Sequence, residues 1–142
     1  MLVGELAVVV AAIFSGAAVY INLAEHPARL KLADEPLLTQ WKPSYKRGFA
    51  IQASLAVAGF ILGAWAWYLT GDWRWGLGGL VLVSNWPFTL IMIMPVNNRL
   101  MAMSPSSPEP EMRKLMDQWG RLHGVRSCLG LLATAIFIWA MH

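Results

Sequence analysis

The sequence from Trp119 to Met141 reads WGRLHGVRSCLGLLATAIFIWAM. A polar stretch, residues 119–127, is followed by an apolar segment long enough to enter a membrane. Trp119, His123 and Arg126 are spaced so that a helix places all three on one face. An ionisable side chain on a membrane-spanning helix is costly unless it meets a partner, water or a ligand. We therefore treat this face as the candidate functional centre. The next question is which other residues of the chain lie at the same end of the membrane spans.

Composition places the chain among integral membrane proteins. It has 142 residues, of which 57% are hydrophobic and 13% are charged, against roughly 45–50% and about 25% in soluble domains. Eight tryptophans fit aromatic belts at the membrane interface. The net charge of +3 is small and lies beside apolar segments, so it does not indicate nucleic-acid binding. We expect one domain, residues 1–142, whose first partner is the lipid bilayer; no feature identifies a protein partner.

Four apolar runs have the length of transmembrane helices. They cover residues 2–24, 48–70, 75–95 and 125–141. The first is about 34 Å long as a helix, and a hydrocarbon core is roughly 30 Å thick. Consecutive spans must alternate in direction, so the sequence predicts an all-α integral membrane fold, an antiparallel bundle of four transmembrane helices.

The first connector, residues 25–47, is predicted to be polar and largely outside the spans. Pro27 lacks an N–H and disfavours helical geometry at the preceding residue, so the first helix is expected to kink or stop there. Leu37, Leu38 and Trp41 have the spacing of a short helix at the membrane interface.

Later in the chain, proline and small polar residues mark bends and turns. Pro87 lies near the middle of the third span, where Asn85 or Thr89 can satisfy the backbone groups that it frees; a pocket residue is the alternative interpretation of Asn85. Gly71 and Asp72 indicate a tight turn. Ser107 is a plausible start for a helix that continues into the fourth span.

Basic residues predict the orientation. The first and third connectors carry five and four Lys or Arg, whereas the second carries only Arg74 and the termini carry none. The positive-inside rule therefore places both large connectors in the cytoplasm and both termini outside a plasma or inner membrane.

This topology gathers polar residues at the cytoplasmic end of the bundle, where we predict a pocket for a lipophilic ligand with a polar group. The expected contributors are Asn22, Glu25, His26, Arg29, Gln52, Asn97, Asn98, Arg99, Trp119, His123 and Arg126. Taken singly, the arginines are explained by lipid phosphates or helix ends, and a lone histidine by a structural hydrogen bond. Two histidines together with an arginine inside a span favour a functional site.

Three short motifs carry a resemblance. The segment Pro87–Leu100, the segment Trp119–Ser127 and the pairing of Asn22 with His26-Pro27 resemble a family of small four-span membrane proteins of largely unknown function that includes the fungal anthrone oxygenases. The resemblance implies an oxygenase that acts without flavin or haem on an electron-rich, phenol-like carbon acid. By position, it puts forward His26, Asn97, His123 and Arg126.

The first hypothesis is cofactor-free oxygenation of a phenol-like or quinol-like lipophilic substrate. His123, or in second place His26, removes a proton from the bound aromatic, because an imidazole has an ordinary pKa near neutrality. Arg126 stabilises the resulting anion, which reacts with dissolved oxygen. The substrate-binding candidates are Asn22, Gln52, Asn97, Arg99 and Trp119.

Two alternatives stay open on sequence alone. His26, His123 and Glu25 offer the ligand set of a non-haem metal site, without any close spacing to support it. The chain can also be a non-catalytic bundle that binds a lipid or quinone-like molecule, or a small accessory subunit. If His26, His123 and Arg126 point into lipid, the catalytic hypotheses lose their basis.

Overall fold

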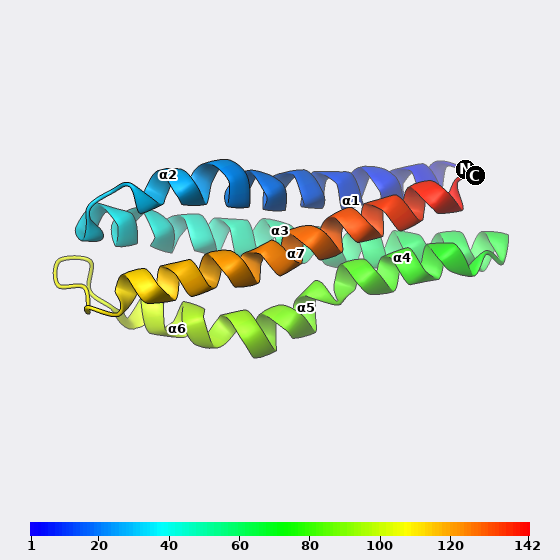
Figure 1. Ribbon diagram of the computed structural model, residues 1–142. Helices are drawn as coiled ribbons and strands as arrows, with labels where there is room; N and C mark the ends of the chain where they lie inside the picture. The colour runs from blue at the N-terminus through cyan, green and yellow to red at the C-terminus, as the bar shows by residue number, and fades with distance from the viewer.

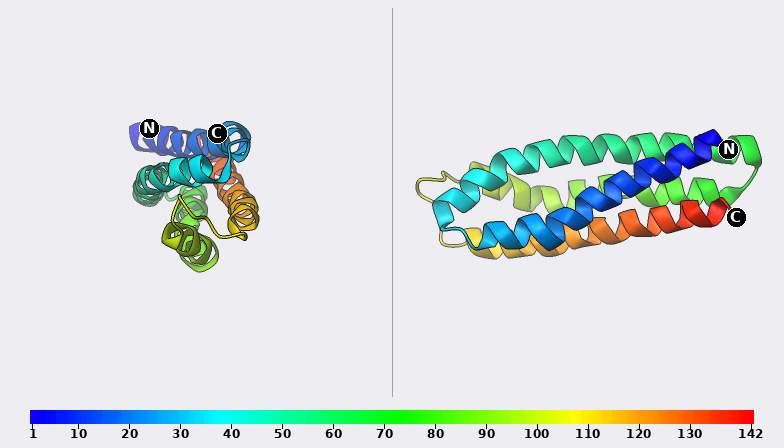
Figure 2. Two further views of the ribbon diagram at one scale, coloured as in Figure 1. Left: turned by 90° about the vertical axis from the view of Figure 1, so that its left-hand side faces the viewer. Right: turned by 90° about the horizontal axis from the view of Figure 1, so that it is seen from above.

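The computed structural model describes residues 1–142 and contains helices and no β-strand. Four long helical segments lie side by side, and both termini lie at the same end (Figures 1 and 2). The segments are Leu2–Leu30, Asp34–Thr70, Trp73–Ala102 and Met112–Ala140, each long and apolar enough to cross a membrane. The prediction of an all-helical fold with four such helices is confirmed.

The first segment does not stop at Pro27. Helix α1 (Leu2–Tyr20) leads into a π-helical turn, η1 (Ile21–Glu25), and then into α2 (His26–Leu30). A π turn has i→i+5 hydrogen bonds and accommodates a residue that cannot continue the regular α pattern. The helix therefore carries Asn22, His26 and Arg29 along the bundle instead of releasing them into a connector.

The predicted polar connector over residues 25–47 is wrong. Helix α3 (Asp34–Thr70) begins almost at once and runs through Pro43, so only residues 31–33 link the first two segments. Leu37, Leu38 and Trp41 are fully buried and belong to the long helix α3, not to a separate short helix. They pack with apolar side chains of the third and fourth segments, so the bundle extends well beyond the apolar run 48–70.

The third segment is broken in its middle. It comprises α4 (Trp73–Val83), α5 (Asn85–Phe88), η2 (Thr89–Ile93) and α6 (Met94–Ala102). Asn85 Nδ2 donates to the carbonyl of Leu82 at 2.9 Å, next to the bend at Pro87, and Asn85 also lines a small cavity, so the structure supports both interpretations of this residue. The Thr89 hydroxyl accepts a hydrogen bond from Arg126 of α7.

The turn before α4 and the start of α7 complete the fold. Gly71 has a φ of 73°, in the left-handed region that favours glycine, and Asp72 caps α4 by accepting from the Arg74 N–H at 3.0 Å. Helix α7 (Met112–Ala140) continues from the polar stretch 119–127 into the apolar span, as predicted. It begins at Met112, a few residues later than the start expected at Ser107.

Two apolar clusters fill the bundle and leave a polar layer between them. One cluster gathers around Phe14, Trp75 and Phe137 toward the end that holds the termini, and the other around Trp41 and Met116 toward the far end. Each long segment places a polar side chain between these clusters: Asn22, which is half-buried, and Gln52, Thr89, His123 and Arg126, which are buried. The fold thus places these side chains at a similar position along the length of the bundle.

Close helix contacts near the termini depend on glycine. A Cβ on Gly63 would lie 2.8 Å from the Trp75 carbonyl oxygen and 3.0 Å from the Phe137 ring. We expect Gly63→Ala to force α3 away from α4 and α7 and to lower the free energy of unfolding by about 1–3 kcal/mol. Gly16→Ala is the matched control, because nothing lies within 4 Å of its Cβ position. Thermal unfolding in detergent should show a lower Tm for the first variant and an unchanged or higher Tm for the second; equal shifts would contradict this packing.

Candidate functional site

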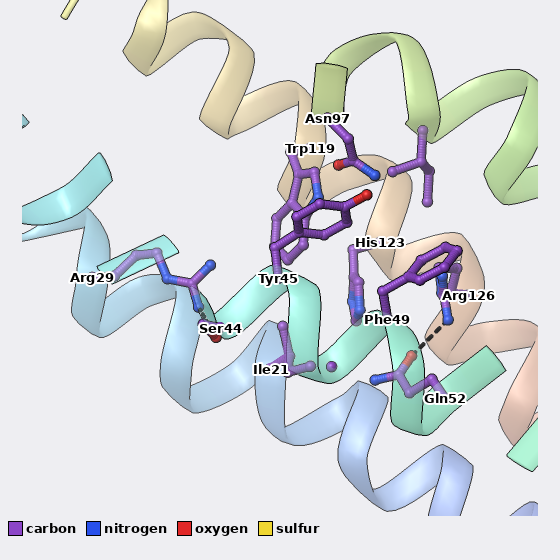
Figure 3. Close-up of a pocket in the computed structure, with 12 residues that line it drawn as sticks. Ile21, Arg29, Ser44, Tyr45, Phe49, Gln52, Asn97, Trp119, His123 and Arg126 are labelled. Carbon is purple, nitrogen blue, oxygen red and sulfur yellow. Dashed lines mark hydrogen bonds between the residues drawn. The ribbon is translucent and has the colours of Figure 1, made fainter. Parts of the chain in front are cut away.

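A small cavity lies in the polar layer between the helices (Figure 3). About 30 Å³ of it is free, enough for one or two water-sized molecules. Its polar lining comes from the first three segments and α7: Arg29, Ser44, Tyr45, Gln52, Asn97, His123 and Arg126. The remaining wall is Ile21, Gly48, Phe49, Ile93 and Trp119.

Arg126 is a buried cation without a counter-ion. The residue is 6% exposed. Its Nη1 donates to Thr89 Oγ1 and its Nη2 donates to Gln52 Oε1, both at 2.8 Å (Figure 3 marks the second bond). Both partners are neutral, and Arg126 forms no ion pair. Arginine keeps its charge in proteins, so the cavity wall holds an unneutralised positive charge in a weakly polar environment, where it would stabilise an anion strongly.

His123 is fixed in one neutral tautomer by Asn22. The Asn22 amide donates through Nδ2 to the carbonyl of Gly120 at 3.0 Å, and its Oδ1 accepts from Ser127 Oγ at 2.6 Å. The same Oδ1 lies 2.8 Å from His123 Nδ1. Because an oxygen acceptor faces Nδ1, that nitrogen carries the proton in the neutral ring. Nε2 has no hydrogen-bond partner in the protein and is free to accept a proton.

His26 contacts Trp119 but is not among the residues that line the cavity. The Trp119 ring centroid is 5.1 Å from that of His26 and 5.0 Å from that of His123, so the indole packs against both imidazoles. His26 does not line the cavity; its Nε2 packs against Gly120, where a Cβ would come within 2.6 Å. The structure therefore brings His123 and Arg126 together at the cavity and leaves His26 outside it.

Glu25 is engaged by neighbours and does not face a metal site. It pairs with Arg29 and also accepts hydrogen bonds from Ser44 and Gln40. No group of three or more His, Cys, Asp or Glu residues is placed to hold a metal ion. The set considered from the sequence, Glu25, His26 and His123, is thus not assembled as ligands.

Two further sequence candidates have different environments. Asn97 is 1% exposed, lines the cavity, and has no hydrogen-bond partner for either side-chain polar atom; in Figure 3 it points toward the Tyr45 hydroxyl. An unpartnered buried amide is uncommon and suits a site that a ligand completes. Arg99 lies away from the cavity, where it pairs with Glu111 at 2.6 Å and has a 55% exposed side chain.

Sequence reasoning missed Tyr45 and Phe49, which line the cavity, and the role of Thr89. The cause is the same error that made residues 25–47 a connector. Trp41, Tyr45 and Phe49 recur every four residues and lead directly to Gln52, a helical stripe that could have revealed the early start of α3.

The fold and site define a bundle of four helices, apolar enough for a membrane, that encloses a histidine and an unneutralised arginine. The family model for anthrone oxygenase matches residues 41–136, and the chain belongs to that family. The matched range includes every cavity-lining residue except Ile21 and Arg29.

Curated relatives agree with this assignment. The chain is 30% identical to anthrone oxygenase AgnL2 of Paecilomyces divaricatus, over 92% of this chain and 89% of the relative. It is 31% identical to an anthrone oxygenase of Claviceps purpurea, over 82% and 75%, and 28% identical to anthrone oxygenase tpcL of Aspergillus fumigatus, over 92% and 87%. No solved structure matches the chain.

Proposed function

We propose that this protein is a multi-pass membrane oxygenase that uses dioxygen, without flavin, haem or metal, to oxygenate a lipophilic phenol-like carbon acid of the anthrone class. The observation that carries the proposal is that His123, with a free Nε2, and Arg126, with an unneutralised charge, line one cavity. The substrate class comes from the names of the relatives.

The proposed bundle is antiparallel and lies in the cell membrane with its cavity toward the cytoplasm. The support is the excess of Lys and Arg at the end opposite the termini. The lipid-facing surface of the four segments carries large apolar side chains, including Val9, Ile13, Ile61 and Leu131, as insertion requires.

The first chemical step is proton transfer. His123 Nε2 takes a proton from the acidic methylene carbon of the substrate, and the electron pair of the C–H bond delocalises onto the substrate oxygen. The resulting anion is a phenolate-like species whose oxygen lies against Arg126, while Asn97 supplies an amide hydrogen bond. Arg126 favours the anion over the neutral substrate, and this difference lowers the barrier.

The second step transfers electrons to dioxygen, which partitions into the bilayer. The carbanion form donates electrons to O₂, and a C–O bond forms at the former methylene carbon to give a hydroperoxide after protonation. Loss of water then leaves a carbonyl group, so CH₂ and O₂ become C=O and H₂O. The substrate is oxidised by four electrons, and O₂ is the only oxidant required.

The proposal is tested by stoichiometry and isotope incorporation. Protein reconstituted in liposomes, treated with chelator and given a hydroxylated anthrone, is expected to consume one O₂ per substrate and to place one atom from ¹⁸O₂ in the new carbonyl. Loss of activity on chelation with recovery on metal addition would contradict a cofactor-free reaction. Binding of anthrones or quinones without any turnover would favour the non-catalytic bundle instead.

A further inference from the structure

We propose that the substrate reaches the cavity sideways from the bilayer, through a portal between α3 and α5 that Trp86 guards. The inference rests on the proposed function for the identity of the substrate, and it adds the route and the residues that select for size. It is carried by a groove and two cavities that share lining residues in series.

The opening originates in the broken third segment. The chain leaves regular α-helix at Ser84, forms the short helix α5 around Pro87, and continues as the π turn η2. Past α5 this segment packs mainly on α7 and has few contacts with α3. The bend is visible where α5 joins α4 (Figure 1). Without this bend, the rest of the third segment would continue the close packing that α4 makes with α3.

An apolar groove of about 550 Å³ marks the outer end of the route. It follows α3 along small side chains, among them Ala50, Ala53 and Ser54, and ends at Trp86. This volume falls within the range of small-molecule sites. The groove is on the lipid-facing side, since Ile61 and Trp86 are 55% and 40% exposed.

A second cavity continues the route inward. It shares Ala53 and Trp86 with the groove, and it shares Phe49, Gln52 and Arg126 with the main cavity. The three spaces are therefore consecutive, separated only by side chains. By contrast, the polar hollow near His26 and Asp117 shares no lining residue with the main cavity, so that hollow offers no comparable way in.

Two hydrogen bonds hold the portal closed. Trp86 Nε1 donates to the carbonyl of Ala53 at 3.1 Å, which ties the indole across the outer junction. Arg126 Nη2 donates to Gln52 Oε1 at 2.8 Å across the inner one. A substrate that displaces Gln52 presents its oxygen to the Arg126 nitrogen just released. The route thus delivers the group that becomes negative directly to the cation, which favours an aromatic substrate over a lipid acyl chain.

The first test narrows the portal without touching the polar residues. Ala53→Leu adds bulk where groove and second cavity meet, whereas Ala12→Leu adds the same bulk to an exposed position on α1. With a hydroxylated anthrone in liposomes, we expect Ala53→Leu to lower kcat/KM at least tenfold with a small effect on kcat, and Ala12→Leu to leave both unchanged. Unchanged kcat/KM in Ala53→Leu, with turnover intact, would overturn the portal and leave the proposed function standing.

The second test does not depend on turnover, and it decides the matter if Ala53→Leu fails to fold. In a Cys128→Ser background, Ala53→Cys and Ala12→Cys are labelled with a lipophilic maleimide under anaerobic conditions, where anthrone binds and is not consumed. Anthrone is expected to slow labelling at position 53 at least threefold and to leave position 12 unaffected. Equal effects of anthrone at both positions would refute a substrate portal. So would slow labelling at position 53 that is the same with and without anthrone.

Discussion

Replacing Arg126 by methionine is expected to lower kcat by about a hundred- to a thousandfold while leaving the protein at least as stable as the unmodified chain. Removing one preformed donor to a developing oxyanion typically has an effect of this size, and Arg126 is the only cavity cation free of an ion pair. The free energy of unfolding is expected to stay the same or to rise, because the guanidinium is buried with neutral partners only. An apolar side chain of similar length avoids the desolvation of an unpaired charge.

The measurement is anthrone turnover and thermal unfolding on the same preparation. Arg47→Met serves as the control, since Arg47 is an exposed residue of α3 away from the cavity, and both its activity and its Tm should be unchanged. If Arg126→Met lost activity only together with a large drop in Tm, Arg126 would be a structural residue. Loss of turnover in a stable protein separates the two roles.

Replacing His123 by alanine is expected to reduce kcat/KM by about a hundred- to ten-thousandfold, the usual contribution of a positioned general base. A base works only when unprotonated, so turnover of the unmodified protein should fall as the pH drops through the pKa of the imidazole, and this limb should vanish in His123→Ala. His142→Ala removes an exposed terminal histidine and is the control. Equal losses in His26→Ala and His123→Ala would contradict the placement of His123 at the cavity and of His26 outside it.

The companion change Asn22→Leu tests how His123 is held. Without the Oδ1 acceptor, neither the tautomer nor the ring orientation is fixed, so we expect a smaller loss, about ten- to a hundredfold, comparable to the removal of other groups that orient a histidine. The acidic limb of the pH profile should shift in this variant. A loss without any change in the pH profile would mean that Asn22 supports only the packing of α1 on α7.

Much of the fold follows from the sequence because it depends on local physics. Apolar runs of sufficient length predict four helices wherever they occur in the chain, and this was confirmed. Pro87 with Asn85 predicted a bend that the hydrogen bond to Leu82 supports. The helical spacing of Trp119, His123 and Arg126 placed three residues on one face, and all three line the cavity.

Tertiary structure decided which of the polar residues meet. The sequence could not show that a π turn carries the first helix past Pro27, or that α3 begins at Asp34, because both depend on packing against other helices rather than on local preference. These two features bring Tyr45 and Phe49 to the cavity and place Asn22 against His123. Spacing along one helix fixed the pair His123 and Arg126, whereas the position of His26 outside the cavity depends on how it packs against Trp119 and Gly120, a contact among distant parts of the chain.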